Sequence, residues 1–230
     1  MPVLQKMKSR VCAQVFPPLI DYLETHGQAE IRHRLLADAY GRTLEIGTGS
    51  GENLKHYSSA VTELIATDHS PLMLRILRDK LTASPPSVGS WRLEQMGAER
   101  LPYPDDSFDT VVATYVQCAV PDPLASMHEI NRVLRPGGQY LFLEHVRSPK
   151  GTVYGSLQDL VAWPHTWIFD GCYPNRDFER TLRDSPLAVE VLEHGSMPVV
   201  QFAVKPIILG KACAAAAATV EEGLDNEQNE

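Results

Sequence analysis

The chain has 230 residues, which is enough for one sizeable domain and short for two. Its 21 basic and 29 acidic side chains give a formal net charge of −8, which argues against nucleic acid or an anionic membrane as the main partner. Hydrophobic residues make up 43% and charged residues 22% of the chain, which excludes a disordered or fibrous protein.

The cysteine spacing and the start of the chain indicate the cellular compartment of the protein. Four widely spaced cysteines form no Cys-x-x-Cys pair, so we expect no disulfide framework, no metal site and a reducing cytoplasm. The start, MPVLQKMKSR, is basic without an apolar core behind it, and reads as neither a signal peptide nor a membrane anchor. No run approaches the roughly 18–20 apolar residues of a spanning helix.

The first two thirds of the chain predict alternating helices and strands. Residues 1–40 read as a helical cap. Strands are then expected at 43–47, 63–68, 90–95, 108–116 and 139–146. Helices are expected to start at 52 and to cover 71–81 and 121–135. This alternation is typical of βαβ units. It predicts an α/β fold in which helices cover both faces of a mostly parallel sheet.

The last third has a different pattern. Residues 176–184 read as a helix, and residues 188–195 and 199–210 as two adjacent strands, which favours an antiparallel hairpin at one edge of the sheet. The alanine-rich and acidic residues 211–230 have no amphipathic face and read as a frayed extension. We therefore expect a single domain over 1–210, with an inserted specificity segment at 146–175.

The strongest motif is LEIGTGSG at residues 44–51, where a buried strand runs into three alternating glycines. Glycine permits a positive φ and lets a ligand approach bare backbone, so a nucleotide-like ligand fits this edge. A plain strand–helix turn is the alternative. The GxGxG spacing differs from the GxGxxG of a pyrophosphate-binding dinucleotide fold, which counts against a nicotinamide-dependent oxidoreductase.

Asp68 stands at the tip of the second strand, after ELIAT. An acidic side chain there can accept hydrogen bonds from both hydroxyls of a ribose. The alternative is N-capping of the helix that begins at Pro71, alone or together with Ser70.

Four segments in this order resemble the successive motifs of class I S-adenosylmethionine-dependent methyltransferases: LEIGTGSGEN, ATDHSPLML, GAERLPYPDDSFDTVVATYVQC and HEINRVLRPGGQYLFLEHV. The resemblance covers roughly residues 15–210. It implies a Rossmann-like sheet of seven strands with an antiparallel last strand, and S-adenosyl-L-methionine as cofactor, with S-adenosyl-L-homocysteine as product. A narrower resemblance, carried by ATYVQCAV and FDGCYPNRDFERTL, is to a methyltransferase-like family that includes small alkyl-thiol methyltransferases.

The resemblance also implies roles for single residues. The amino-acid portion of the cofactor would lie against Gly47, Thr48, Gly49 and Gly51. Glu45 would orient that turn or meet the cofactor's ammonium group, and Asp68 would hold the ribose.

The other implied contacts follow the next strands. His69 and Met73 would flank the adenine, and Ala98 and Glu99 would meet its edge. Many relatives have an aspartate before that alanine, where this chain has Gly97. Thr114 and Tyr115 would lie beside the methyl group.

The acceptor end of the site has one candidate general base, His145, which follows Glu144 at the end of the fifth strand. A structural histidine bonded to the neighbouring loop is the alternative. The stretch from Trp163 to Trp167 is expected to wall an apolar acceptor pocket or to pack an inserted helix on the sheet. Cys118 and Cys172 read as buried small hydrophobes or as reactive thiols.

The sequence thus predicts a cytoplasmic enzyme that methylates a small, partly apolar acceptor by in-line displacement in a desolvated cleft, with sulfur as a candidate acceptor atom. The alternatives are an N- or O-methyltransferase of a natural product or quinone, and a non-catalytic cofactor-binding regulator. Oligomeric state and pathway are left open.

Overall fold

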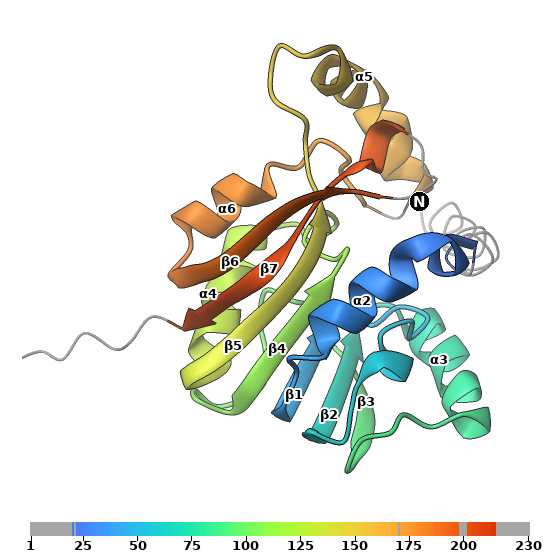
Figure 1. Cartoon of the computed structure of the whole chain (residues 1–230), viewed down its shortest axis with the longest axis vertical. Coiled ribbons are helices and arrows are strands. Elements are labelled where there is room, and N and C mark those ends of the chain that lie inside the picture. Colours follow the sequence, from blue (N-terminus) through green and yellow to red (C-terminus); the bar gives the residue numbers. More distant parts are fainter. Residues whose placement is uncertain (1–19, 21, 170, 198–201, 215–230) are drawn as a thin grey trace, which may run out of the picture.

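A computed structural model describes residues 20, 22–169, 171–197 and 202–214. Its strands are β1 (Gly41–Ile46), β2 (Val61–Asp68), β3 (Trp91–Gln95), β4 (Phe108–Thr114), β5 (Leu134–His145), β6 (Leu187–Ser196) and β7 (Pro206–Ala214). They form one sheet in the order β3-β2-β1-β4-β5-β7-β6 (Figure 1). The first five strands pair in parallel, and β7 lies antiparallel between β5 and β6. The expected seven-stranded, mostly parallel sheet is confirmed.

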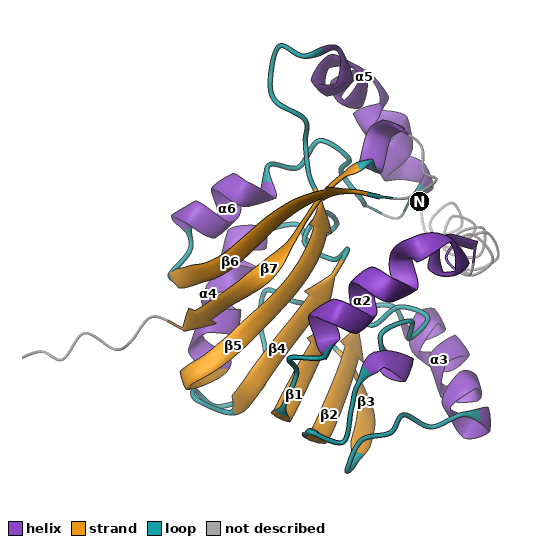
Figure 2. Ribbon diagram, in the orientation of Figure 1, coloured by secondary structure: helices purple, strands orange, loops and turns teal. Residues whose placement is uncertain are grey.

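Helices lie on both faces of this sheet (Figure 2). They are η1 (Glu24–Gln28), α2 (Ala29–Leu36), η2 (Leu54–His56), α3 (Pro71–Ala83), α4 (Pro123–Val133), α5 (Val153–Ile168), α6 (Phe178–Asp184) and η3 (Phe202–Val204). Side chains of β5 alternate between the faces, as the two-residue period of a strand requires. Phe142 lies in the cluster that contains residues of α4 and α6, whereas Leu141 and Leu143 lie in the cluster on the opposite face, which contains residues of α2.

The parallel pairing brings four strand ends to one edge of the sheet. β1, β2, β4 and β5 end at Ile46, Asp68, Thr114 and His145, and their parallel pairing brings these carboxyl ends together. Open α/β sheets bind their ligands outside this edge.

The helix expected to start at residue 52 is reduced to the single 3-10 turn η2. Tyr57 ends that turn in an extended conformation, with φ −71° and ψ 141°. Its ring is 3% exposed and its hydroxyl donates a hydrogen bond to Glu45 over 2.9 Å. This buried anchor turns the chain toward β2, so the prediction of an α-helix here is wrong.

The strand expected at 199–210 is also wrong in its bounds, because residues 202–204 form η3 and β7 runs from Pro206 to Ala214. Residues 211–214 pair with β6, and residues 211–213 pair with β5 as well. Ladder bonds on both sides override the weak strand preference of alanine. The rest of the expected tail, 215–230, and the first 19 residues of the expected helical cap lie outside the described residues. Within the described part of the chain, none of the helices is long and apolar enough to span a bilayer.

Candidate functional site

The glycine turn after β1 leaves bare backbone facing open space. Gly47 and Gly49 have φ angles of +66° and +53°, in the left-handed region that favours glycine. A Cβ on Gly47 would lie 2.5 Å from Val116, so the turn packs closely there. A Cβ on Gly49 would meet no atom within 4 Å. A ligand can therefore approach Gly49 directly, which fits the cofactor that the resemblance implies.

Asp68 connects the end of β2 to this turn. Its Oδ2 accepts a hydrogen bond from the Gly49 amide over 2.9 Å, and its Oδ1 accepts one from the Ser70 amide over 2.8 Å. The cap of α3 is Ser70, whose hydroxyl accepts from the Met73 amide. Ser70 is therefore the residue that caps the N-terminus of α3. Each carboxylate oxygen of Asp68 keeps a free lone pair for a ribose hydroxyl.

Glu45 is buried under the glycine turn and is 1% exposed. Its carboxylate accepts hydrogen bonds from Asn53 over 3.1 Å and from Tyr57 over 2.9 Å. Burial raises the pKa of Glu45 above its ordinary value, although these hydrogen bonds and the charge of Arg32 oppose the rise. These contacts favour a role for Glu45 in orienting the segment after the turn, the first of its two expected roles.

Arg32 on α2 reaches the same place, and the sequence interpretation missed it. It is 6% exposed, and its guanidinium donates to Glu24 over 2.8 Å and to Asn53 and Thr114 over 2.7 Å each. The signal was present, because Arg32 lies three and four residues before Leu35 and Leu36, on the buried face of the helix.

Tyr115 follows β4 in a strained conformation, with φ +58°. Such a conformation costs an aromatic residue on the order of 1–3 kcal/mol and tends to occur at functional sites. The tyrosine hydroxyl donates to Gln28 over 2.8 Å, and the amide donates to the Leu143 carbonyl over 2.7 Å. Burial raises the pKa of this phenol. Tyr115 is thus held as a neutral group beside Thr114.

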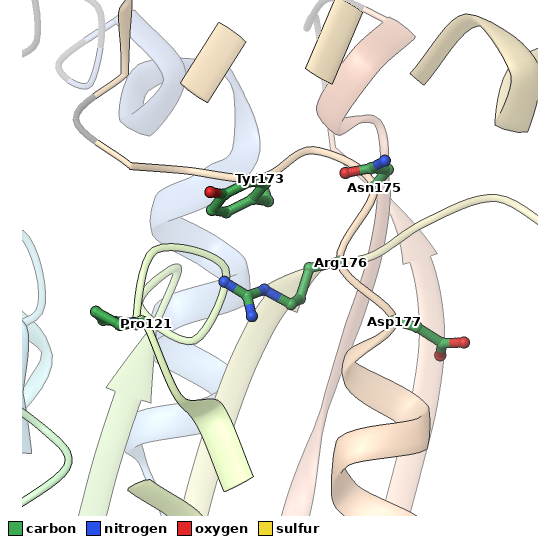
Figure 3. A pocket seen from close by; sticks show the side chains of 5 residues that line it. All are labelled: Pro121, Tyr173, Asn175, Arg176 and Asp177. Atoms are coloured by element: carbon green, nitrogen blue, oxygen red, sulfur yellow. The ribbon is translucent and has the colours of Figure 1, made fainter. Parts of the chain in front are cut away.

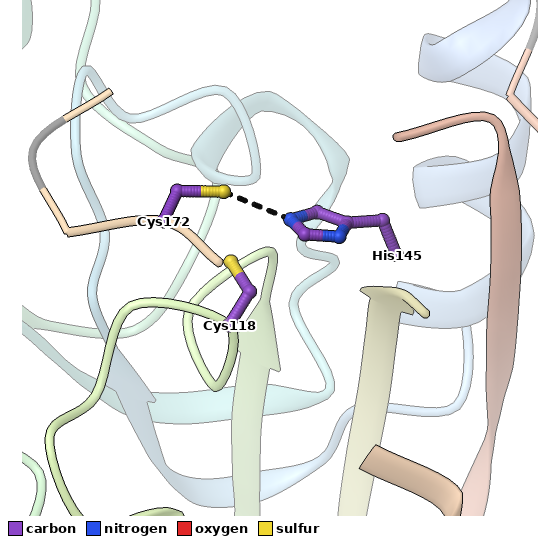
Figure 4. Close-up of side chains that lie close together, drawn as sticks. All are labelled: Cys118, His145 and Cys172. Carbon is purple, nitrogen blue, oxygen red and sulfur yellow. Dashed lines mark hydrogen bonds between the residues drawn. The ribbon is translucent and has the colours of Figure 1, made fainter. Parts of the chain in front are cut away.

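His145 is buried at the end of β5, with 3% of its surface exposed. Its Nε2 lies 3.0 Å from the sulfur of Cys172 (Figure 4). Burial lowers the pKa of His145, but Cys118 and Glu144 outweigh burial and the net shift is upward.

The carboxylate of Glu144, the residue before His145, faces the loop after β4. It accepts hydrogen bonds from the Val116 and Gln117 amides over 2.8 and 2.9 Å. Burial raises the pKa of Glu144 to about 7. Glu144 therefore holds the segment that carries Tyr115 and Cys118.

The remaining predicted cofactor contacts are dispersed along the same edge. His69 is exposed, and its Nδ1 lies 3.5 Å from Asp68. Met73 is half-buried in the first turn of α3, close in sequence to both. Ala98 is buried in the core, and Glu99 accepts a hydrogen bond from the Asp122 amide over 3.4 Å. The structure thus brings His69 next to Asp68, whereas Glu99 contacts the start of α4.

The tryptophans expected to wall an acceptor pocket lie on the surface of α5. Trp163 is 80% exposed and Trp167 is 51% exposed. Side chains this exposed neither enclose a pocket nor pack α5 on the sheet. They form part of an apolar surface on that helix.

A pocket of about 490 Å³ lies beside the loop between α5 and α6 (Figure 3). Its lining residues are Pro121, Tyr173, Asn175, Arg176 and Asp177. The Arg176 guanidinium stacks over the Tyr173 ring at 5.0 Å and donates to the Val120 carbonyl over 2.9 Å. Arg176 thereby fastens this loop to the one after β4.

Comparisons with known proteins agree with this arrangement. Residues 44–142 match the methyltransferase domain family. Human thiol S-methyltransferase TMT1B is 28% identical over 215 residues, covering 88% of this chain and 87% of its own length. Phosphatidylethanolamine N-methyltransferase of Cereibacter sphaeroides is 34% identical over 157 residues, covering 68% and 74%.

A solved structure gives the same fold. The YcgJ protein of Bacillus subtilis superposes with a TM-score of 0.63 at 19% identity, over 84% of this chain and all of its own. The glycine turn, the acidic residue at the tip of β2 and the antiparallel β7 all agree with these relatives' shared family. The chain belongs to the class I S-adenosylmethionine-dependent methyltransferases.

Proposed function

We propose that this methyltransferase acts on the sulfur of a small, partly apolar thiol. The carrying observation is the similarity to the human thiol S-methyltransferase, which extends over 88% of the chain. At the ends of β4 and β5, Tyr115 donates to Gln28, one oxygen of Glu144 accepts from two backbone amides, and His145 Nε2 contacts a cysteine sulfur. An acceptor that needs no protein base suits such a site, and a thiol with a pKa of about 8.5 supplies its own thiolate.

The cofactor would supply the activated methyl group, and the protein would bind and orient the reactants. Bound S-adenosylmethionine supplies a methyl group on a positively charged sulfur, which is already activated for displacement. The backbone at Gly49 and the carboxylate of Asp68 would bind and orient it. The buried Thr114 and the strained Tyr115 would fix the acceptor's approach and exclude water, which is the main contribution a protein makes to such a displacement.

The share of the chain that each relative matches also supports a thiol as the acceptor. The similarity to the human thiol S-methyltransferase extends over 88% of the chain, against 68% for the phosphatidylethanolamine N-methyltransferase. The latter supports a second candidate, an amine on a lipid. The exposed apolar side chains of α5, among them Leu160 and Trp163, favour that candidate because they suit a lipid acceptor.

A transfer assay with methyl-labelled cofactor separates these candidates. The acceptors are an alkanethiol, an ethanolamine phospholipid in vesicles and a phenol. We expect label in the thioether, with a rate that rises with pH as the thiol ionises. Asp68→Ala serves as the control with weakened cofactor binding. Label in the phospholipid alone would replace the thiol by the lipid amine, and no transfer to any acceptor would contradict both.

A further inference from the structure

Three side chains with zinc-binding chemistry meet at the carboxyl edge of the sheet (Figure 4). Cys118 follows β4, His145 ends β5, and Cys172 precedes α6. One ligand atom from each lies within 4.8 Å of the others. Cys118 and His145 are 27 residues apart, as are His145 and Cys172, and no short motif joins them. Only the fold reveals the cluster, and the expectation of no metal site did not foresee it.

Backbone contacts hold the two cysteines in place. The Tyr173 amide donates to the Cys118 carbonyl over 3.0 Å, which joins the neighbour of Cys172 to Cys118 itself. The Arg176 guanidinium donates to the same carbonyl over 3.3 Å. His165 Nδ1 lies 3.1 Å from the Cys172 carbonyl oxygen. The loop carrying Cys172 is therefore fixed to the loop carrying Cys118 before any ligand binds.

The donor set suits one class of ion. Two thiolates and an imidazole are ligands of Zn²⁺, and three protein ligands leave the fourth tetrahedral position to a water or a substrate. With Zn–S near 2.3 Å and Zn–N near 2.0–2.1 Å, the ligand atoms of a tetrahedron lie about 3.6–3.8 Å apart. The separation of His145 Nε2 and Cys172 Sγ is 3.0 Å, and all three ligand atoms lie within 4.8 Å of one another, so small shifts of these side chains would reach that value.

The three candidate ligands differ in burial, and the His145 ring lacks strong partners. Cys118 and His145 are 2% and 3% exposed, whereas Cys172 is half-buried. His145 has no hydrogen bond at Nδ1 among the described residues, and its Nε2 meets only a sulfur, a weak partner. A metal bond to this ring would offset the cost of burying it, which those contacts do not.

We propose that Cys118, His145 and Cys172 bind Zn²⁺ and leave its fourth position to the sulfur of the acceptor thiol. The acceptor part of this assignment rests on the thiol methylation proposed above. A metal at these three ligands lies at the same edge as the glycine turn and Asp68, where the cofactor binds.

Zn²⁺ binding and acceptor coordination release three protons, and methyl transfer then follows. Cys118 and Cys172 lose their protons to solvent when the metal binds, and the acceptor loses its S–H proton when its sulfur coordinates. The acceptor thiolate then attacks the methyl carbon, forming a new carbon–sulfur bond. The bond from that carbon to the cofactor sulfonium breaks, and its electron pair stays on the leaving sulfur. The product thioether has no charge and dissociates from the metal.

Metal binding is tested on the full reduced chain after chelator treatment. Titration with Co²⁺ should give one ion per chain with a thiolate-to-cobalt absorption band, and Zn²⁺ should displace it. Cys172→Ser should weaken Zn²⁺ binding by at least about 100-fold, more than the loss of an outer-shell partner costs. Cys213→Ser, a half-buried cysteine on β7 outside the cluster, should leave it unchanged. Equal Zn²⁺ affinity in the two variants would overturn the proposal.

A measurement on the unmutated chain guards against a variant that fails to fold. Zn²⁺ should protect Cys172 from iodoacetamide while Cys213 reacts at an unchanged rate, as read by peptide mass spectrometry. Equal labelling of Cys172 with and without Zn²⁺ would overturn the metal site.

A third measurement separates this proposal from the proposed function. An alkanethiol added to the cobalt-loaded chain with S-adenosylhomocysteine should shift the visible cobalt bands. Unchanged bands, with S-adenosylhomocysteine bound by calorimetry, would overturn the acceptor's place on the metal. A chain that methylates thiols equally well after complete metal removal would also overturn that place, and would leave the proposed thiol methylation standing.

Discussion

The guanidinium of Arg32 donates a hydrogen bond to the hydroxyl of Thr114 over 2.7 Å. This contact joins α2 to the carboxyl end of β4, 82 residues further along the chain. The same guanidinium pairs with Glu24 and lies 5.3 Å from the centre of the Tyr115 ring. The helix before β1 is therefore part of the site, because it fixes the residues expected beside the methyl group.

Replacing Arg32 by methionine should strongly destabilise the fold. The change leaves the Glu24 carboxylate buried, and removing one partner of a buried ion pair typically costs about 3–5 kcal/mol. Lys55, 3.2 Å from Glu24, limits the loss to the lower end of that range. Urea unfolding measures the effect.

Arg34→Met is the matched control on the same helix. Arg34 pairs with Glu193 at the surface, where both side chains are about half exposed, so its loss should cost at most about 1 kcal/mol. Equal losses in the two variants would contradict a structural role for the Arg32 contacts.

Replacing Asp68 by alanine should weaken binding of S-adenosylhomocysteine by roughly 10- to 150-fold, since hydrogen bonds to a charged group contribute about 1.5–3 kcal/mol. Isothermal titration calorimetry gives the dissociation constant. Ser70→Ala is the control, because it removes the cap of α3 and so lowers stability by about 1 kcal/mol without touching the carboxylate. An unchanged dissociation constant in Asp68→Ala would mean that Asp68 does not bind the cofactor and serves only through its hydrogen bonds to Gly49 and Ser70.

The sequence was sufficient for the five parallel strands and for the turn that ends β1. Apolar runs of the right length, separated by helical stretches, specify β1 to β5, and the glycines at 47 and 49 adopt the positive φ expected of them. These features depend on local pattern and local backbone geometry, which a single sequence carries.

Features that depend on distant contacts were missed. The turn at η2 follows from the bond between Tyr57 and Glu45, and residues 211–213 of β7 follow from pairing on two sides. The cluster of Cys118, His145 and Cys172 depends on three separate strand ends and loops. No spacing rule brings such residues together, because the fold alone determines their distance.

Glu45 predicts a pH dependence of stability. Burial holds the pKa of Glu45 above its ordinary value of about 4.3, so the folded chain binds this proton more tightly than the unfolded chain does. Lowering the pH from neutrality toward that ordinary value should therefore stabilise the wild type relative to Glu45→Gln, which cannot titrate. Urea unfolding of both chains at several pH values measures the difference. If the stability of the wild type relative to Glu45→Gln stays constant or decreases as the pH falls, the raised pKa is contradicted.

Replacing an exposed tryptophan should change acceptor binding without changing the stability of the fold. Trp163 is 80% exposed, so Trp163→Ala should change the free energy of unfolding by no more than about 0.5 kcal/mol. If α5 contacts the apolar part of the acceptor, the KM for the acceptor rises while the KM for the cofactor stays constant. His165→Ala, a buried position on the same helix, should instead lower the melting temperature. A lower melting temperature in Trp163→Ala would show that its ring packs against the protein.

Arg176 fastens the loop of Cys172 to the loop of Cys118, so its replacement should release both. Its guanidinium donates to the carbonyls of Cys118 and Val120 over 3.3 and 2.9 Å. Arg176→Gln cannot reach both acceptors, and losing hydrogen bonds from a charged donor should cost about 1.5–3 kcal/mol.

Thiol alkylation distinguishes this role from a general loss of stability. In wild type Cys118 is 2% exposed and should react slowly with iodoacetamide. Once the loop is released, Cys118 should react many times faster, while Cys213 on β7 keeps its rate. Arg180→Gln is the control, because Arg180 pairs with Asp184 at the surface and touches neither loop. Faster alkylation of both cysteines in Arg176→Gln would indicate global unfolding, whereas an unchanged rate at Cys118 would show that other contacts, such as the bond from the Tyr173 amide, suffice to hold the two loops together.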